Sequence, residues 1–388
     1  MFLVAGDGER ENFHRSARAP PATRRHAGHI IRCYNSAGHS LNSGLCRVPD
    51  SIVLWKLLAE YVIVRTVVTT REQALRCLKL SLLAAAIVCA IGIVQSLGHF
   101  GIAGVLAKYY TPTGLDTSLT SGRGGSLLGL PAAVADLAIL NLAIAVAMLV
   151  RGYPRRLWLG ALAALYGLGV VAAAEFSTFL GLFVALVALM AVTKSGRIAA
   201  YAIPVALFGG VLLWPVIRTR LAGFDSATGL PISWTDRLFN LRTYFWPVLF
   251  SDHNWILGVR PAARIPLVSK RFSYVWIESG YTWLLWGGGL PLLASYLAFV
   301  CAAVRKGWIY TRRADAAGIA ATAVVTALCA QVFLMILDPH LTYRGSGDML
   351  FLILALVRRL PSERSKLTDD DQATSAARTA RASAGVPA

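Results

Sequence analysis

Residues 157–193 read LWLGALAALYGLGVVAAAEFSTFLGLFVALVALMAVT, and Glu175 is the only charged residue among them. On either side of Glu175 lies an apolar run long enough to cross about 30 Å of hydrocarbon as a helix. Because so few residues separate the two runs, only a tight turn can connect them. The stretch therefore predicts two antiparallel membrane-spanning helices, at 157–174 and 176–193.

Comparable apolar runs recur from residue 78 to residue 360. Of the 388 residues, 56% are hydrophobic and only 15% are charged, a balance unlike that of a soluble domain. The short alternating segments typical of a transmembrane β-barrel are absent from the sequence. We therefore expect an all-α, polytopic helical integral membrane protein with about eight or nine transmembrane helices and one large external loop. The predicted spans are 78–99, 127–150, 157–174, 176–193, 198–217, 277–304, 315–337 and 347–360.

Composition divides the chain into three regions. Residues 1–50 are rich in Arg, Ser, His and Gly and are predicted to be a disordered tail, or the product of a start assigned too far upstream. Residues 51–360 form the predicted membrane domain, and 361–388 a disordered tail. The apolar segment 51–68 carries Lys56, Glu60 and Arg65, so it is either a first span or a helix lying in the membrane interface.

Positively charged connections set the predicted orientation, because cytoplasmic loops of membrane proteins carry an excess of Lys and Arg. Such clusters lie at 151–156, 194–197, 305–313 and 358–359. Alternation of the spans is consistent if all of these are cytoplasmic. This places the C-terminus in the cytoplasm and the loop 217–277 outside the membrane.

The external loop is unexpectedly basic for its side of the membrane, with eight Arg and Lys against three Asp in residues 217–277. Arg237 and Arg242 lie among aromatic residues, and Arg260 follows near the end of the loop. One interpretation is an interfacial amphipathic helix whose arginines meet lipid phosphate. The other is a clamp for pyrophosphate, since the planar guanidinium makes paired hydrogen bonds to phosphate oxygens. The two interpretations are compatible.

Glu278 lies at the predicted outer mouth of the span 277–304. A carboxylate facing lipid there would be costly, so it needs a partner or a role. It either pairs with Lys270 or Arg271, or serves as a general base or an acceptor for sugar hydroxyls.

Two further polar segments precede predicted spans. The turn 338–348 contains Asp338, His340 and Arg344, and it is either an ordinary polar turn or a second side of the same site. Arg123 lies among glycines at 122–125, which form either a flexible turn or a nest of backbone amides for an anion. Glu175 is either structural or lines a cavity.

The sequence predicts neither a metal nor a cofactor. The His and Cys residues between 26 and 46 fit no zinc spacing, and there is no phosphate loop, dinucleotide fingerprint or zinc-peptidase helix. The formal net charge of +18 is assigned to anionic lipid headgroups and orientation, and no nucleic acid is expected as a partner.

The order of these pieces resembles the O-antigen polymerase and ligase superfamily of bacterial envelope polysaccharide enzymes. The resemblance covers residues 52–360 and rests on several diffuse matches taken together. These are Arg123 to Pro131, the turn 174–178, the external loop from Arg237 to 256–259, the segment 277–281 with 287–289, and the turn 338–348.

The resemblance implies metal-independent glycosyl transfer at the outer face of the bacterial cytoplasmic membrane. The implied substrate is an oligosaccharide on polyprenyl pyrophosphate, and membrane lipids and other polysaccharide assembly and export proteins are the implied partners. Arg237 and Arg242 would hold the pyrophosphate and Glu278 would act as the base. The further implied substrate-binding residues are Arg123, Arg344, His340, Asp338 and Arg260.

Two departures from the superfamily matter. Its ligases usually have a His where this chain has Glu278, which favours a polymerase over a ligase. Its members also have more spans and a longer N-terminal half. A ligase acting on another acceptor, and a non-enzymatic polysaccharide transporter or flippase, remain the alternatives.

The predicted orientation can be tested with topology reporters. We expect a tag at Ala262 to be reachable from outside the cell, and tags at Tyr310 and Ala373 to be cytoplasmic, because the Arg clusters stay inside. A cytoplasmic signal from Ala262 would reverse the orientation.

Overall fold

The computed structural model describes residues 48–109, 122–224, 229–259, 264–266 and 274–361. Residues 1–49 and 50–388 are separate units, and the helical bundle belongs to the second. The tails predicted at 1–50 and 361–388 therefore fall almost wholly outside the described residues.

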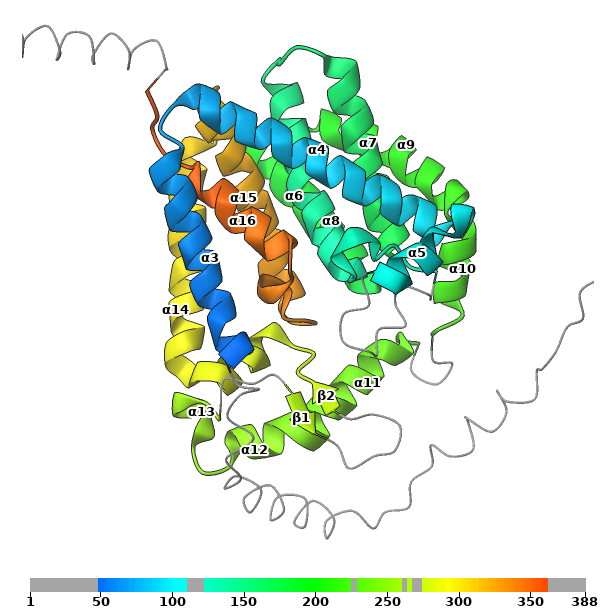
Figure 1. The fold of residues 1–388 in the computed structure, drawn as a ribbon, viewed down its shortest axis with the longest axis vertical. Helices are drawn as coiled ribbons and strands as arrows, with labels where there is room; N and C mark the ends of the chain where they lie inside the picture. The colour runs from blue at the N-terminus through cyan, green and yellow to red at the C-terminus, as the bar shows by residue number, and fades with distance from the viewer. Residues whose placement is uncertain (1–47, 110–121, 225–228, 260–263, 267–273, 362–388) are drawn as a thin grey trace, which may run out of the picture. The chain divides into compact units, whose positions relative to one another are not determined.

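The described part is almost entirely helical, which confirms the predicted all-α class (Figure 1). Six helices are long and apolar enough to cross a membrane, and the bent pair α9–α10 makes a seventh. A helix lies on each of the eight predicted spans, although α16 is short. The long helices are α3 (Val48–Val67), α4 (Arg71–Ser96), α6 (Pro131–Val150), α7 (Arg156–Ala173), α8 (Phe176–Thr193), α9 (Arg197–Leu212), α14 (Gly280–Tyr310), α15 (Ala316–Leu334) and α16 (Ser346–Ala355).

Shorter elements connect these helices. Between α4 and α6 lie η3 (His99–Gly101), α5 (Ile102–Tyr109) and η5 (Ser126–Leu128). After α9 come α10 (Trp214–Leu221), α11 (Ile232–Asn240), the π-helical turn η6 (Leu241–Phe245), α12 (Trp246–Phe250), α13 (Asn254–Leu257), β1 (Arg264–Pro266) and β2 (Tyr274–Trp276), and η7 (His340–Thr342) precedes α16. The two strands pair antiparallel, with Arg264 opposite Trp276.

Helices α6 and α15 form the centre of the bundle, with most of their side chains buried. Both are rich in Ala, and small side chains allow helices in a membrane to approach closely. Helix α14 is largely exposed and lies at the periphery.

Helix α3 packs along α16 (Figure 1). Lys56 forms an ion pair with Asp348, Leu57 is buried close to Gly347, and near the other end the Arg358 guanidinium donates to the Val68 carbonyl. These contacts join α3 to α16 and to the residues after it at a few points. Among the described residues, α3 is not one of the helices long and apolar enough to cross a membrane, and both interpretations of the segment 51–68 stay predictions.

The basic connections gather at one end of the bundle. The Arg151 guanidinium donates to the carbonyls of Thr311 at 2.7 Å and Gly318 at 3.0 Å, which ties the α6–α7 connection to the α14–α15 connection. Arg71, at the start of α4, donates to the Leu360 carbonyl at 2.7 Å. The clusters predicted to share one side of the membrane therefore do lie together.

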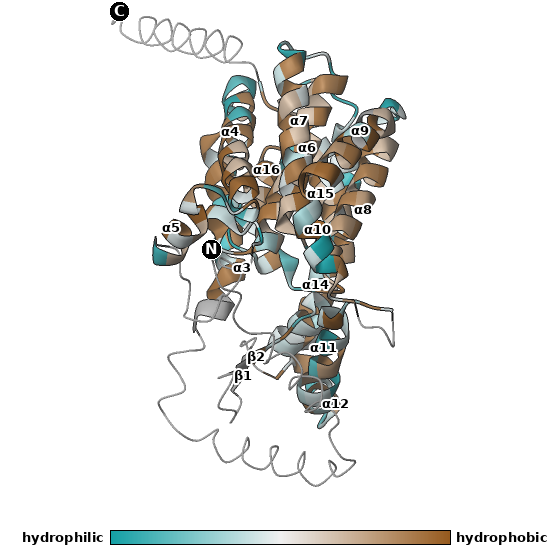
Figure 2. Ribbon diagram, turned by 90° about the vertical axis from the view of Figure 1, so that its right-hand side faces the viewer, coloured by the Kyte–Doolittle hydropathy of each residue, from teal (hydrophilic) through white to brown (hydrophobic). Residues whose placement is uncertain are grey.

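The opposite end carries the predicted external loop. Figure 2 shows α11 and α12 beyond the ends of the apolar helices, with more polar colouring than the bundle. Phe245 and Trp286 are both buried and stack edge to face at 5.4 Å, which anchors the loop to α14.

A glycine break in α14 receives the end of α13. Gly289 has a φ of 62°, and a Cβ there would collide with the Ile256 carbonyl. The Val259 amide donates to the Trp286 carbonyl at 2.8 Å. The glycines at 287–289 thus let the end of α13 pack against α14 at the break in that helix.

Candidate functional site

Four segments converge where the external loop meets the bundle. They are α11, the residues just before α14, the turn between α15 and α16, and the turn between α7 and α8. Each contributes charged side chains, and all lie outside the long helices.

Arg237 on α11 joins two of these segments. Its Nη2 lies 2.8 Å from Oδ2 of Asp338, and its Nε lies 3.8 Å from Oε1 of Glu278. Its Nη1 donates to the Leu337 carbonyl at 3.1 Å. The guanidinium thus faces two carboxylates, and their negative charges raise its pKa although burial acts to lower it.

Glu278 is held from both sides. Asn240, one helical turn after Arg237 on α11, donates to Glu278 Oε2 at 3.2 Å. The Gly280 amide donates to the Met335 carbonyl at 2.8 Å, which ties this segment to the turn that carries Asp338. Burial, together with the Asp338 charge, raises the pKa of Glu278 although Arg237 acts to lower it. A carboxyl group whose pKa is raised by burial binds a proton more readily than an exposed one.

His340 pairs with a carboxylate inside the bundle. Its Nδ1 lies 2.7 Å from Oδ2 of Asp136, which is on the first turns of α6, and the imidazole is fully enclosed. Burial acts to lower the pKa of His340, but the charges of Asp136, Asp338 and Glu175 outweigh it and raise the pKa. His340 and Asp136 therefore form a close, buried hydrogen-bonded pair.

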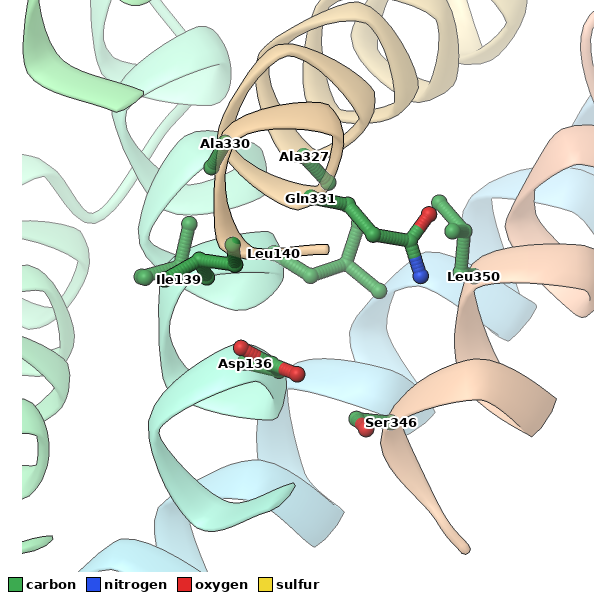
Figure 3. A pocket seen from close by; sticks show the side chains of 9 residues that line it. Asp136, Ile139, Leu140, Ala327, Ala330, Gln331, Ser346 and Leu350 are labelled. Atoms are coloured by element: carbon green, nitrogen blue, oxygen red, sulfur yellow. The ribbon is translucent and has the colours of Figure 1, made fainter. Parts of the chain in front are cut away.

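A small cavity adjoins this pair on the bundle side (Figure 3). Asp136, Gln331 and Ser346 face it, and about 20 Å³ is open to a water-sized molecule, enough for one water. Apolar side chains form its remaining walls: Ile139, Leu140, Ala327, Ala330, Leu334 and Leu350.

Arg123 forms a close ion pair with Glu175 in the α7–α8 turn. The turn is held by its neighbours: the Gly124 amide donates to the Ala172 carbonyl at 2.9 Å, and Arg220 Nε donates to the Ala174 carbonyl at 2.6 Å. A Cβ on residue 124 would lie 2.8 Å from the Gly92 carbonyl, so only glycine allows this approach.

The structure brings most of the predicted site residues into one electrostatic group. Arg237, Glu278 and Asp338 are in direct contact, and Glu175, the partner of Arg123, contributes to the potential at both Arg237 and His340. At 122–125 the Gly124 backbone packs against Gly92 and Ala172, and the Arg123 side chain pairs with Glu175.

Three predicted residues lie elsewhere. Arg242 and Arg344 are exposed, outside this group, and Arg260 lies outside the described residues. Five residues along an α-helix are about 140° of rotation, and Arg242 is exposed whereas the Arg237 side chain is largely buried among its carboxylate partners. Lys270 and Arg271 also lie outside the described residues, and the described partner of Glu278 is Arg237.

Sequence reasoning did not single out Arg220, Asn240 or Tyr343. Asn240 follows Arg237 by three residues, a spacing that marks one helix face once the helix is known. Tyr343 hydrogen-bonds to Asp338, and its ring centroid lies 4.8 Å from that of His340. Arg220 carries no local signal, because its partner is a backbone carbonyl of another turn.

Within the described ranges, no three His, Cys, Asp or Glu side chains come together as a metal site. Comparisons with protein-family models, with curated proteins and with solved structures gave no match, so the geometry alone must carry a functional assignment.

The His340–Asp136 pair predicts a pH-dependent stability. The pKa of His340 is higher in the folded than in the unfolded protein. Its contribution to the free energy of unfolding is therefore complete below the unfolded pKa of about 6.5, and it is lost as the pH rises through the folded pKa. We expect the thermal midpoint of the purified protein to exceed that of His340→Gln at pH 6, and the gap to narrow towards pH 9. A contribution of about 1 kcal/mol corresponds to roughly 2–4 °C. Parallel pH profiles for the two proteins would contradict this.

Proposed function

We propose that this protein is a lipid-linked glycan polymerase, acting at the outer face of the bacterial cytoplasmic membrane with its C-terminus in the cytoplasm. It extends an O-antigen or exopolysaccharide chain carried on polyprenyl pyrophosphate. The single observation that carries the proposal is the Arg237-linked pair of carboxylates at the mouth of a membrane bundle, beside a second group of arginines.

The proposed reaction needs a base and a cation. An acceptor hydroxyl attacks the anomeric carbon of the donor, and a new glycosidic C–O bond forms. The bond between the anomeric carbon and the phosphate oxygen breaks, and its electron pair leaves with the polyprenyl pyrophosphate. The hydroxyl proton passes to Glu278, whose raised pKa suits this role.

Arg237 is best assigned to orienting Glu278. Its charge is already matched by Asp338 and Glu278, so a pyrophosphate would have to compete with two carboxylates for it. Arg123 pairs with one carboxylate, Glu175, and Arg220 donates to the neighbouring Ala174 carbonyl, so these two arginines contact fewer carboxylates than Arg237 does. The reaction needs one side chain that accepts the hydroxyl proton and other side chains that stabilise the negative charge on the leaving pyrophosphate. Glu278 would serve the first need, and Arg123 with Arg220 the second.

The position of the charges supports an enzyme over a transporter. A transporter site is expected near the middle of the bilayer. Here the ionisable groups gather at the bundle end, and Asp136 lies only five residues, about 7.5 Å, into α6. A ligase would use the same chemistry, and only its acceptor differs.

The direct test supplies the purified protein with a polyprenyl-pyrophosphate-linked oligosaccharide. Longer chains on the lipid carrier are the expected product. Transfer to a different acceptor would identify a ligase, and unchanged oligosaccharide under conditions that preserve the folded protein would contradict glycosyl transfer.

Arg237→Lys tests the orienting role. A lysine keeps the charge but cannot reach Asp338, Glu278 and the Leu337 carbonyl together, so we expect polymerisation to fall about tenfold or more. Arg242→Lys is the matched control, and we expect normal activity because Arg242 is exposed. Equal losses in both variants would argue for a general electrostatic role of the loop.

Glu278→Gln tests the base. The amide keeps the size and the hydrogen bond to Asn240 but cannot accept the proton, so turnover should fall about 10²-fold or more. Asp252→Asn, which changes an exposed carboxylate in the same loop, should leave turnover unchanged. Near-normal turnover in Glu278→Gln, with an unchanged thermal midpoint, would exclude Glu278 as the base.

A further inference from the structure

The α7–α8 turn carries a buried charge group that the proton transfer at Glu278 does not use. Glu175 is only 8% exposed, and its Oε1 pairs with Arg123. Its Oε2 and the Nε of Arg123 are buried without a hydrogen-bond partner among the described residues. Leaving a buried polar atom unpaired is unfavourable, so the pair is a suboptimal resting arrangement.

A second guanidinium lies at the same turn. The Arg220 Nε donates to the carbonyl of Ala174, the residue before Glu175, at 2.6 Å. Two arginines therefore lie at the turn that carries Glu175, and Arg123 forms the ion pair with it.

The start of α8 adds further donors at this place. Glu175 is the N-cap residue of α8, yet its side chain does not cap the helix. The first amides of a helix have no partner within the helix, and they favour an anion. The two guanidinium groups and the helix start thus point to a ligand with several negatively charged oxygens.

We propose that Arg123 and Arg220 form the subsite for the pyrophosphate of the lipid-linked substrate, and that Glu175 is a built-in counterion which this pyrophosphate displaces. The identity of the ligand rests on the proposed function. A pyrophosphate offers more charge and more acceptor oxygens than one carboxylate, so it satisfies both arginines. The returning carboxylate would in turn favour release of the pyrophosphate product.

The role of Glu175 distinguishes this subsite from a simple basic patch. In a simple basic patch, removal of the Glu175 charge would raise the affinity for any anion, including a lipid headgroup, to a similar extent. As a competitor for Arg123, it must weaken the affinity for pyrophosphate. Glu175→Gln retains a hydrogen-bonding oxygen for Arg123 but removes the competing charge.

The test measures binding of inorganic pyrophosphate and of farnesyl pyrophosphate to the purified full chain by titration calorimetry. For both probes we expect Glu175→Gln to bind about tenfold more tightly than the unmodified protein, since a nearby unit charge is removed. Arg123→Gln and Arg220→Gln should each weaken binding about tenfold or more. Arg242→Gln, which removes an exposed charge from the same end of the bundle, should bind as the unmodified protein does.

Unchanged or weaker pyrophosphate binding in Glu175→Gln would overturn the proposal, and this variant decides the question even if an arginine variant fails to fold. An equal loss in Arg242→Gln would also overturn it. Phosphatidylglycerol is the comparison ligand: the same tenfold gain with it would identify a general lipid-headgroup site instead. These assays need no glycosyl transfer. Binding that follows the expected pattern without chain extension would leave the subsite standing and remove the polymerase assignment.

Discussion

The ion pairs of Arg237 hold the site together. A guanidinium on the external loop contacts Asp338 after α15 and lies near Glu278 before α14, so three segments distant in sequence share one charge centre. Partly buried charges are costly unless paired, and removing one member of such a group leaves the others uncompensated, at a cost of about 3–5 kcal/mol for fully buried pairs. If the loop moved away from the bundle, Asp338 and Glu278 would lose the positive charge that lies between them.

Close backbone contacts at glycines set the positions that these charges need. Gly289 lets the Ile256 carbonyl enter a break in α14, which fixes the end of the loop just inside the mouth of that helix. Gly124 lets its own backbone approach Gly92 and Ala172, which brings Arg123 to the α7–α8 turn. In both cases a Cβ would clash with a backbone carbonyl of the neighbouring segment, so the close approach depends on glycine.

The charged side chains at this end of the bundle belong to one electrostatic group with two parts. Around Arg237, two carboxylates accompany one guanidinium, and burial raises the pKa of Glu278 and of Asp338. At the α7–α8 turn, Arg123 pairs with Glu175 and Arg220 donates to the Ala174 carbonyl. The proposed proton transfer and the proposed anion binding would use these different parts of the group. The buried His340 side chain pairs with Asp136 on the first turns of α6.

The sequence by itself determined the helices, their spans and the basic connections that share one end. A run of apolar residues long enough to cross hydrocarbon must satisfy its own backbone as a helix, so local composition suffices. It also marked Arg237, Glu278, Asp338 and His340 as candidate site residues, and the structure brings these four side chains close together. Only the tertiary structure decided that Arg237 enters the site while Arg242 remains exposed, and that His340 meets Asp136, 204 residues away. Such pairings depend on how each helix is rotated about its axis and against which neighbour it packs, and no local pattern encodes either.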